Sequence, residues 1–212
     1  IPEWIKAPVP SEYEPLLSTY SCIKRWDEAP ELPGSVEFIK TCKKNGVLPA
    51  IAHTHATYEN VLQGFEAGMT HATHFYNAMH VPPVMLRVVY MIKGVERTAL
   101  ITDSLACAAS DGDIAFDPRV ILEDGVCKLA DHSALAGSIA TMDRLIRTCV
   151  QKAKIPMEDA CRMASETPAK IMGVFDRKGS LEDGKDADII MFDKDLNLTY
   201  VMQMGREVTN DL

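Results

Sequence analysis

Long apolar runs are missing from this sequence. No stretch approaches the roughly 18 apolar residues of a membrane span, and the opening IPEWIKAPVP lacks the pattern of a secretory signal peptide. Basic residues are also few, because 22 lysines and arginines stand against 30 aspartates and glutamates, a net charge of −8. This balance argues against nucleic acid or an anionic membrane as the main partner. We therefore expect a soluble protein.

Paired cysteine motifs are missing as well. No C-x-x-C occurs, and no internal repeat or low-complexity segment is found. The scattered cysteines are typical of reduced, mostly buried thiols, and they predict a cytoplasmic protein. They are Cys22, Cys42, Cys107, Cys127, Cys149 and Cys161.

In the first half of the chain, segments with strand character alternate with segments of helical periodicity. The opening to Gly34 is rich in proline and predicts irregular structure with a short strand at 22–26. Continuous apolar runs then predict buried parallel strands, and helical periods predict the helices between them. In chain order we expect a helix at 35–46, a strand at 47–54, a helix at 57–68, a strand at 69–78, a helix at 84–94 and a strand at 97–104. This order predicts βαβ units with the reactive residues at the carboxyl ends of the strands.

The pattern changes after Asp103. Residues 114–131 alternate and turn at Asp124-Gly125, which predicts a β-hairpin. Residues 141–153 and 157–173 predict helices, the second one broken before Pro168. The tail at 187–208 predicts two short strands of a small β-layer.

Histidines gather between residues 49 and 80. This segment holds His53, His55, His71, His74 and His80, five of the six in the chain. His53 and His74 each end a predicted strand and lie 21 positions apart (74 − 53), one strand–helix unit. Adjacent parallel strands run about 4.8 Å apart, so these two side chains can converge on one ion. Neutral imidazole suits zinc or iron, and an open site needs about three protein ligands.

The sequence also suggests roles for Asp103 and for the remaining histidines. Asp103 ends a later predicted strand, where it would exchange a proton with water and a leaving group. Spacing alone leaves open that the strand-end histidines only form hydrogen bonds. His55 falls where its strand gives way to a loop. His71 lies three residues before His74, so a period of two places it on the opposite face and predicts a structural role.

Five segments point to one family. They are AHTHATYE, THATHFYNAM, LITDSLACAASDGD, LAGSIATMD and GSLEDGKDADIIMFD. THATHFYNAM is similar to A-T-H-L-[FY]-N-A-M, and LAGSIATMD is similar to L-[AS]-G-S-x-x-T-M. Together these segments resemble the N-acetylglucosamine-6-phosphate deacetylases of the amidohydrolase superfamily, from about residue 23 to 208. The resemblance implies a (β/α)8 TIM-type barrel, incomplete in residues 1–178, and the C-terminal part of a small β-domain in residues 179–212.

The resemblance also implies roles for individual residues. His53 and His74 correspond to metal ligands for one or two divalent ions, zinc first and iron, cobalt or manganese as alternatives. Asp103 corresponds to the catalytic acid and base, and His80 to a residue that polarises the amide carbonyl. Further substrate contacts are implied for Asn77, Ala78, Leu135, Ala136 and Gly137. His55 departs from the family pattern, and we expect it not to bind the metal.

Two departures from the family concern ligands. The family's third metal ligand is a glutamate in an E-G-P segment, and no E-G-P occurs here. The arginine that binds phosphate is not identifiable, because Met79 directly precedes His80, and Arg87 is a poor substitute. A half barrel leaves strand edges unpaired, so we expect these residues to belong to a longer molecule.

We consider three candidate functions, in order of preference. The first is hydrolysis of N-acetyl-D-glucosamine 6-phosphate to glucosamine 6-phosphate and acetate, with an amino-sugar phosphate as partner and a homodimer as the expected assembly. The second is the same reaction on the galactosamine epimer. The third is a truncated, non-catalytic sugar-phosphate binder. A dihydroorotase is disfavoured by the THFYNAM and LAGSIATMD segments.

Overall fold

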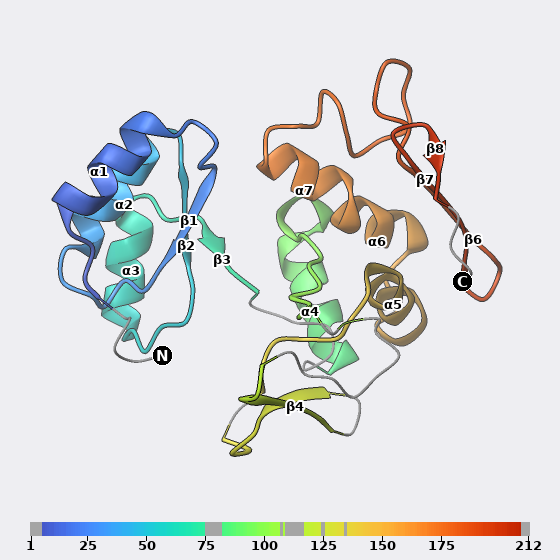
Figure 1. Cartoon of the computed structure of the whole chain (residues 1–212), viewed down its shortest axis with the longest axis horizontal. Coiled ribbons are helices and arrows are strands. Elements are labelled where there is room, and N and C mark those ends of the chain that lie inside the picture. The colour runs from blue at the N-terminus through green and yellow to red at the C-terminus, as the bar shows by residue number, and fades with distance from the viewer. Residues whose placement is uncertain are drawn as a thin grey trace. The chain divides into compact units, whose positions relative to one another are not determined.

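The computed structural model describes residues 6–74, 82–106, 108, 117–123, 126–133 and 135–208 (Figure 1). It divides the chain into two compact units, Ile1–Phe75 and Tyr76–Leu212, and each is described by itself. Within the described residues, no helix has the length and apolar character needed to cross a membrane.

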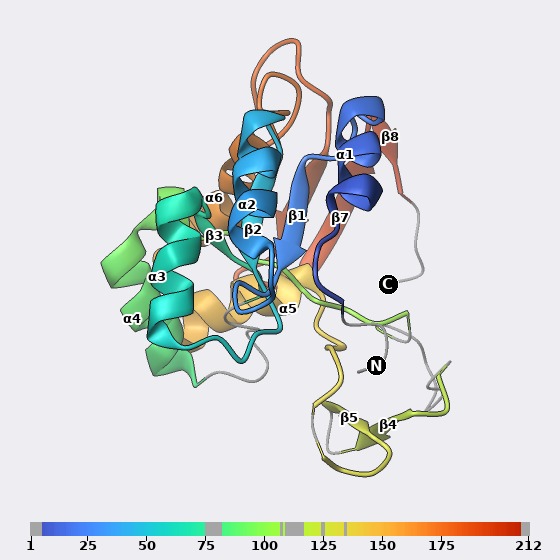
Figure 2. The ribbon, with the colours of Figure 1, turned by 90° about the vertical axis from the view of Figure 1, so that its left-hand side faces the viewer.

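The first unit is a three-stranded parallel sheet with helices on one side (Figures 1 and 2). The sheet has the order β1-β2-β3, with β1 at Arg25–Glu28, β2 at Leu48–Ile51 and β3 at His71–Ala72. The helices are α1 at Pro10–Thr19, α2 at Ser35–Lys44 and α3 at Tyr58–Ala67. The predicted βαβ order is therefore found here, and all three strands end at the same edge of the sheet.

An aromatic cluster holds α1 and α2 against β1. Phe38 packs edge to face on Tyr13 and Trp26, with ring centroids 4.8 Å and 5.3 Å apart. Leu17 and Cys42 are buried in the same cluster. Full burial of such side chains contributes roughly 1.5–3 kcal/mol each. This packing explains why the prediction of an irregular opening was wrong.

The prolines of α1 are placed where a helix tolerates them. Pro10 is the first helical residue, where a missing N–H costs nothing. Pro15 lies inside the helix, and the buried side chains Tyr13 and Leu17 on either side of it offset the lost hydrogen bond.

Glu28 is a buried carboxylate between β1 and α2. Neither of its oxygens has a partner with good hydrogen-bond geometry among the described residues, and the nearby Ser35 hydroxyl, which acts to lower the pKa of Glu28, donates to the Ala29 carbonyl at 3.1 Å. Burial raises the pKa of Glu28 to about 7, and the charge of Glu31 acts in the same direction. Ionisation of Glu28 therefore weakens the folded state.

This carboxylate predicts a specific pH dependence of stability. The folded pKa lies above the unfolded value of about 4.3, so stability present at low pH is lost as pH rises through about 7. Between pH 5 and pH 8 we expect Glu28 to lower the free energy of unfolding by ~1–2 kcal/mol, allowing for its partial solvent exposure.

Urea unfolding of Glu28→Gln at the two pH values tests this expectation. The free energy of unfolding of this variant should fall less between pH 5 and pH 8 than that of the unmodified chain. Glu37 on α2 is exposed, and Glu37→Gln is the matched control, which should keep the pH dependence of the unmodified chain. If the free energy of unfolding changed equally with pH in Glu28→Gln and in the unmodified chain, Glu28 would not be the source of this pH dependence.

The second unit packs helices around one apolar core. Its helices are α4 at Pro83–Lys93, η2 at Val95–Arg97, α5 at Met142–Arg147, a π-helical turn η3 at Thr148–Lys152, α6 at Met157–Ala164 and α7 at Glu166–Ile171. Leu145, Ile146, Cys149 and Met163 are nearly or fully inaccessible at its centre.

Two antiparallel sheets complete the second unit. The predicted hairpin is confirmed as β4 at Val120–Glu123 paired with β5 at Val126–Leu129, and its turn residues lie outside the described ones. The tail forms β6 at Ile189–Phe192, β7 at Leu198–Gln203 and the short β8 at Arg206–Glu207, one strand more than expected.

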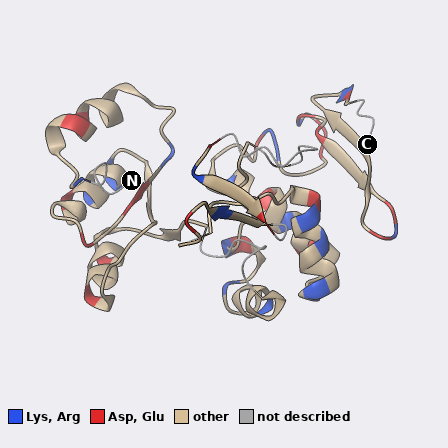
Figure 3. Cartoon of the chain, turned by 60° about the horizontal axis from the view of Figure 1, so that its bottom comes forward, with Lys and Arg blue, Asp and Glu red and all other residues tan. Residues whose placement is uncertain are grey.

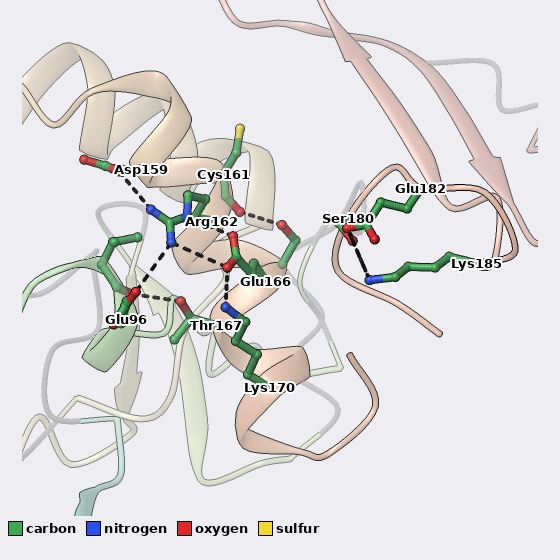
Figure 4. Close-up of polar contacts among 12 residues, drawn as sticks. Glu96, Asp159, Cys161, Arg162, Glu166, Thr167, Lys170, Ser180, Glu182 and Lys185 are labelled. Carbon is green, nitrogen blue, oxygen red and sulfur yellow. Dashed lines mark hydrogen bonds and ion pairs between the residues drawn. The ribbon is translucent and has the colours of Figure 1, made fainter. Parts of the chain in front are cut away.

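Charged residues of both signs occur in both units (Figure 3), and an ion-pair network joins α6 to α7 (Figure 4). Arg162 and Lys170 contact Glu166 at 2.8 Å and 2.5 Å, and these hydrogen bonds lower the pKa of Glu166 to about 2. The helix breaks at Ser165, ahead of Pro168 as predicted. Pro168 falls in the first turn of α7, where its missing N–H is harmless.

The prediction of a strand at 97–104 was wrong for the described residues. Instead of entering a ladder, the Leu100 N–H donates to the Met163 carbonyl at 2.8 Å, at the end of α6. Only Ser104 forms a strand-like bridge there, with Ser138. An apolar run forms a strand only where a neighbouring strand completes its hydrogen bonds.

Candidate functional site

Two histidine side chains meet at the carboxyl ends of β2 and β3. His53 lies two residues beyond β2, and His74 lies two residues beyond β3. Their Nε2 atoms are 2.8 Å apart, and the rings meet edge to face with centroids 4.5 Å apart. This is a hydrogen-bond distance, at which one ring donates and the other accepts according to their tautomers. The structure therefore brings together the two residues that the strand pattern paired.

The predicted site residues have unusual backbone conformations. Non-glycine residues with positive φ include His53 at 46°, His74 at 31° and Asp103 at 51°. Such left-handed backbone costs of order 1–3 kcal/mol at each residue and is concentrated at functional sites. All three predicted catalytic and metal-binding residues thus carry a strain that their surroundings must support.

The histidine pair fits two positions of a metal site. Neutral imidazole nitrogen is a preferred donor for zinc and related divalent ions. Among the described residues, however, no group of three or more histidine, cysteine, aspartate or glutamate side chains gathers to hold an ion. The pair therefore supplies two of the roughly three ligands that an open site needs.

His55 and His71 do not join this pair in the structure. The backbone N–H of His55 donates to Glu31 Oε1 at 2.9 Å, and its side chain is exposed. His71 is half-buried, with Nδ1 3.4 Å from Thr70 Oγ1. Burial lowers the pKa of His71, and the charge of Arg25 adds to the effect, so protonation of the imidazole is disfavoured.

Two carboxylates beside the histidines were not identified from the sequence. Asp27 lies on β1 and accepts a hydrogen bond from Thr73 Oγ1 at 2.9 Å. Glu31 follows β1 and accepts from Thr54 Oγ1 at 2.5 Å. Burial raises the pKa of Glu31, but the hydrogen bonds from Thr54 and from the backbone of His55 outweigh it and hold that pKa below its usual value.

Asp103 lies beside the predicted sugar loop in the second unit. The Leu105 N–H donates to the Ser138 carbonyl at 2.8 Å, and Ser104 bridges Ser138 in parallel fashion. Gly137 has φ 61°, and a Cβ there would lie 2.9 Å from the Leu105 side chain and 3.4 Å from the Asp103 carbonyl oxygen. A side chain at this position would need both a left-handed backbone and a shift of Leu105, so glycine favours the close approach of Gly137 to Leu105 and Asp103.

Asn77, Ala78 and His80 lie outside the described residues. Arg87 donates from one guanidinium nitrogen to the carbonyls of Ala153 and Lys154, at 3.3 Å and 2.8 Å. Its guanidinium group therefore lies at the end of the π-helical turn.

Comparison with known proteins identifies the family. A family model described as "Amidohydrolase family" matches residues 34–208, and the chain belongs to this family. Its members generally depend on a divalent metal ion. The chain is 28% identical to the N-acetylglucosamine-6-phosphate deacetylase of Bacillus subtilis (strain 168), over 96% of this chain and 59% of that protein.

Further relatives include deacetylases of both amino-sugar phosphates. The chain is 26% identical to the N-acetylgalactosamine-6-phosphate deacetylase of a Shewanella species, over 80% of this chain and 50% of that protein. The structure matches a variant N-acetyl-D-glucosamine-6-phosphate deacetylase from Mycobacterium smegmatis, solved in complex with N-acetyl-D-glucosamine-6-phosphate. The TM-score is 0.87 at 28% identity, over 99% of this chain and 64% of that one. The chain thus has an amidohydrolase fold and spans between half and two thirds of the length of these relatives.

Proposed function

We propose that this chain is part of a metal-dependent deacetylase that converts N-acetyl-D-glucosamine 6-phosphate to glucosamine 6-phosphate and acetate. The observation that carries the proposal is the His53–His74 pair, with Nε2 atoms 2.8 Å apart at adjacent strand ends, in a chain similar to such deacetylases. Residues 1–178 belong to a (β/α)8 barrel and residues 179–212 to its small β-domain.

The proposed chemistry assigns each residue one task. A divalent ion, zinc first and one or two in number, supplies Lewis-acid polarisation when bound. His53 and His74 bind it through neutral Nε2 atoms. The Asp103 carboxylate takes a proton from the attacking water and delivers it to the amide nitrogen, which leaves as the amine while acetate forms.

Substrate contacts complete the proposal. Asn77 and Ala78 hold the phosphate or the sugar, and His80 stabilises negative charge on the carbonyl oxygen. The loop at Leu135–Gly137 covers the sugar. We also propose a cytoplasmic location, in keeping with the free cysteines found among the described residues, and a homodimer, which the resemblance to the deacetylases implies.

Release of acetate tests the function directly. The purified protein, supplied with Zn²⁺, is incubated with the N-acetyl 6-phosphates of glucosamine and galactosamine, and free acetate is measured. We expect hydrolysis of the glucosamine compound at the higher kcat/KM. The matched control is the same protein treated with a chelator, which should release no acetate.

Two results would replace this proposal. A higher kcat/KM for the galactosamine compound would favour the second epimer, in line with the similarity to the Shewanella enzyme. Binding of either sugar phosphate without acetate release would favour a non-catalytic binder, and the finding that two rather than three ligands gather among the described residues favours that alternative.

A further inference from the structure

Each histidine of the pair has a threonine beside it that is held by a carboxylate. Thr54 directly follows His53, and its hydroxyl donates to Glu31 Oε2 at 2.5 Å. Thr73 directly precedes His74, and its hydroxyl donates to Asp27 Oδ1 at 2.9 Å. Both carboxylates come from β1 or the residues just after it. A hydrogen bond from a threonine to a carboxylate thus occurs next to each of the two histidines.

Glu31 fixes the backbone on the far side of His53. Its second oxygen, Oε1, accepts the His55 N–H at 2.9 Å, so both carboxylate oxygens are engaged. The Thr54 hydroxyl in turn accepts the Ala56 N–H at 2.9 Å. Three consecutive residues after His53 are therefore tied to one side chain.

Asp27 is fixed in turn by Arg25 on the same strand. Arg25 Nε lies 2.9 Å from Asp27 Oδ1, and a terminal nitrogen donates to Oδ2 at 3.0 Å. The Thr73 N–H donates to the Ile51 carbonyl of β2 at 2.9 Å. Thr73 is thus held through both its backbone and its hydroxyl, one residue before His74.

The histidines need such support because of their backbone. Positive φ is unfavourable for a residue with a Cβ, and it persists only where neighbouring contacts impose it. The orientation of each imidazole follows from the backbone that carries it. Contacts that hold residues 54–56 and 73 therefore also hold the two Nε2 atoms in their facing arrangement.

We propose that Asp27 and Glu31 are positioning residues that set the geometry of the His53–His74 pair for metal binding through Thr73 and Thr54. This inference rests on the proposed function of the two histidines. Among the described residues neither carboxylate forms a group of three potential ligands with the two histidines, and we therefore assign both to the threonines. Loss of a hydrogen bond made directly to a metal ligand typically lowers metal affinity about 10–100-fold, and the bonds here act on the residue next to each histidine.

Cobalt titration of threonine variants tests the proposal. Co²⁺ is added to the purified chain, and the visible absorption of the bound ion gives both affinity and coordination. We expect Thr54→Val and Thr73→Val to weaken Co²⁺ binding ~10–100-fold and to change its spectrum. Thr54→Ser and Thr73→Ser keep the hydroxyl and should restore both.

The controls separate positioning from folding. Thr41→Val, which removes a hydroxyl bonded within α2 to the Glu37 carbonyl, should leave Co²⁺ binding unchanged. Melting temperatures are measured for every variant. If a valine variant does not fold, Glu31→Gln and Asp27→Asn replace it, because they keep the side-chain shape, and the same loss of affinity is expected.

The outcomes distinguish this proposal from the proposed function. If the valine variants bind Co²⁺ as the unmodified chain does while His53→Ala loses it, the positioning role is wrong and the function stands. If the unmodified chain binds no Co²⁺, or if His53→Ala and His74→Ala bind it normally, the proposed metal site is wrong and the positioning role falls with it.

Discussion

Asp103→Asn should lower kcat for acetate release by roughly 10³-fold or more while metal binding is retained, given what a positioned acid or base contributes. The variant keeps the size of the side chain but can no longer accept the proton. Asparagine tolerates the left-handed backbone that Asp103 adopts at φ 51°, so the local fold should persist. The measurement is steady-state kinetics on N-acetyl-D-glucosamine 6-phosphate, with metal content determined on the same sample.

A second aspartate provides the control for this variant. Asp183 is exposed in the segment between α7 and β6, and Asp183→Asn should retain normal turnover. Asp103→Glu should recover part of the activity, since it restores a carboxylate at an altered distance. Turnover of Asp103→Asn close to that of the unmodified chain would show that another group moves the proton.

The sequence predicted the βαβ core because its signals are local. Continuous apolar runs with helices between them identified β2, and Thr57 with Asn60 forms a capping box at the start of α3. The opening helix was missed because its proline content suggested irregular structure, whereas burial of Tyr13 and Leu17 decides the outcome. Tertiary packing overrode propensity there.

The sequence predicted the histidine pair of the candidate site but not the carboxylates beside it. His53 and His74 could be paired because parallel strands place their carboxyl ends at one edge. Their supporting carboxylates could not, since Glu31 and Thr54 are 23 positions apart and Asp27 and Thr73 are 46 apart. No short motif joins such residues, so only the register of β1, β2 and β3 reveals the contacts.

Removing either histidine of the pair should abolish tight metal binding. The proposed function has His53 and His74 bind one ion, so His53→Ala or His74→Ala would leave one imidazole, too few for an open site. The loss of affinity should exceed the ~10–100-fold typical of an outer hydrogen bond. Metal content after dialysis, measured by mass spectrometry, gives the result.

His55→Asn is the matched control for the two alanine variants. It lies two residues from His53, but its described contact to Glu31 is made by the backbone N–H, which asparagine keeps. Retention of metal by His55→Asn, together with its loss in the two alanine variants, would assign the ligands to the ends of β2 and β3. Loss in His55→Asn would instead make the His-x-His segment the ligand pair, and the strand-end argument would then fail, because two ligands from one loop require no neighbouring strand.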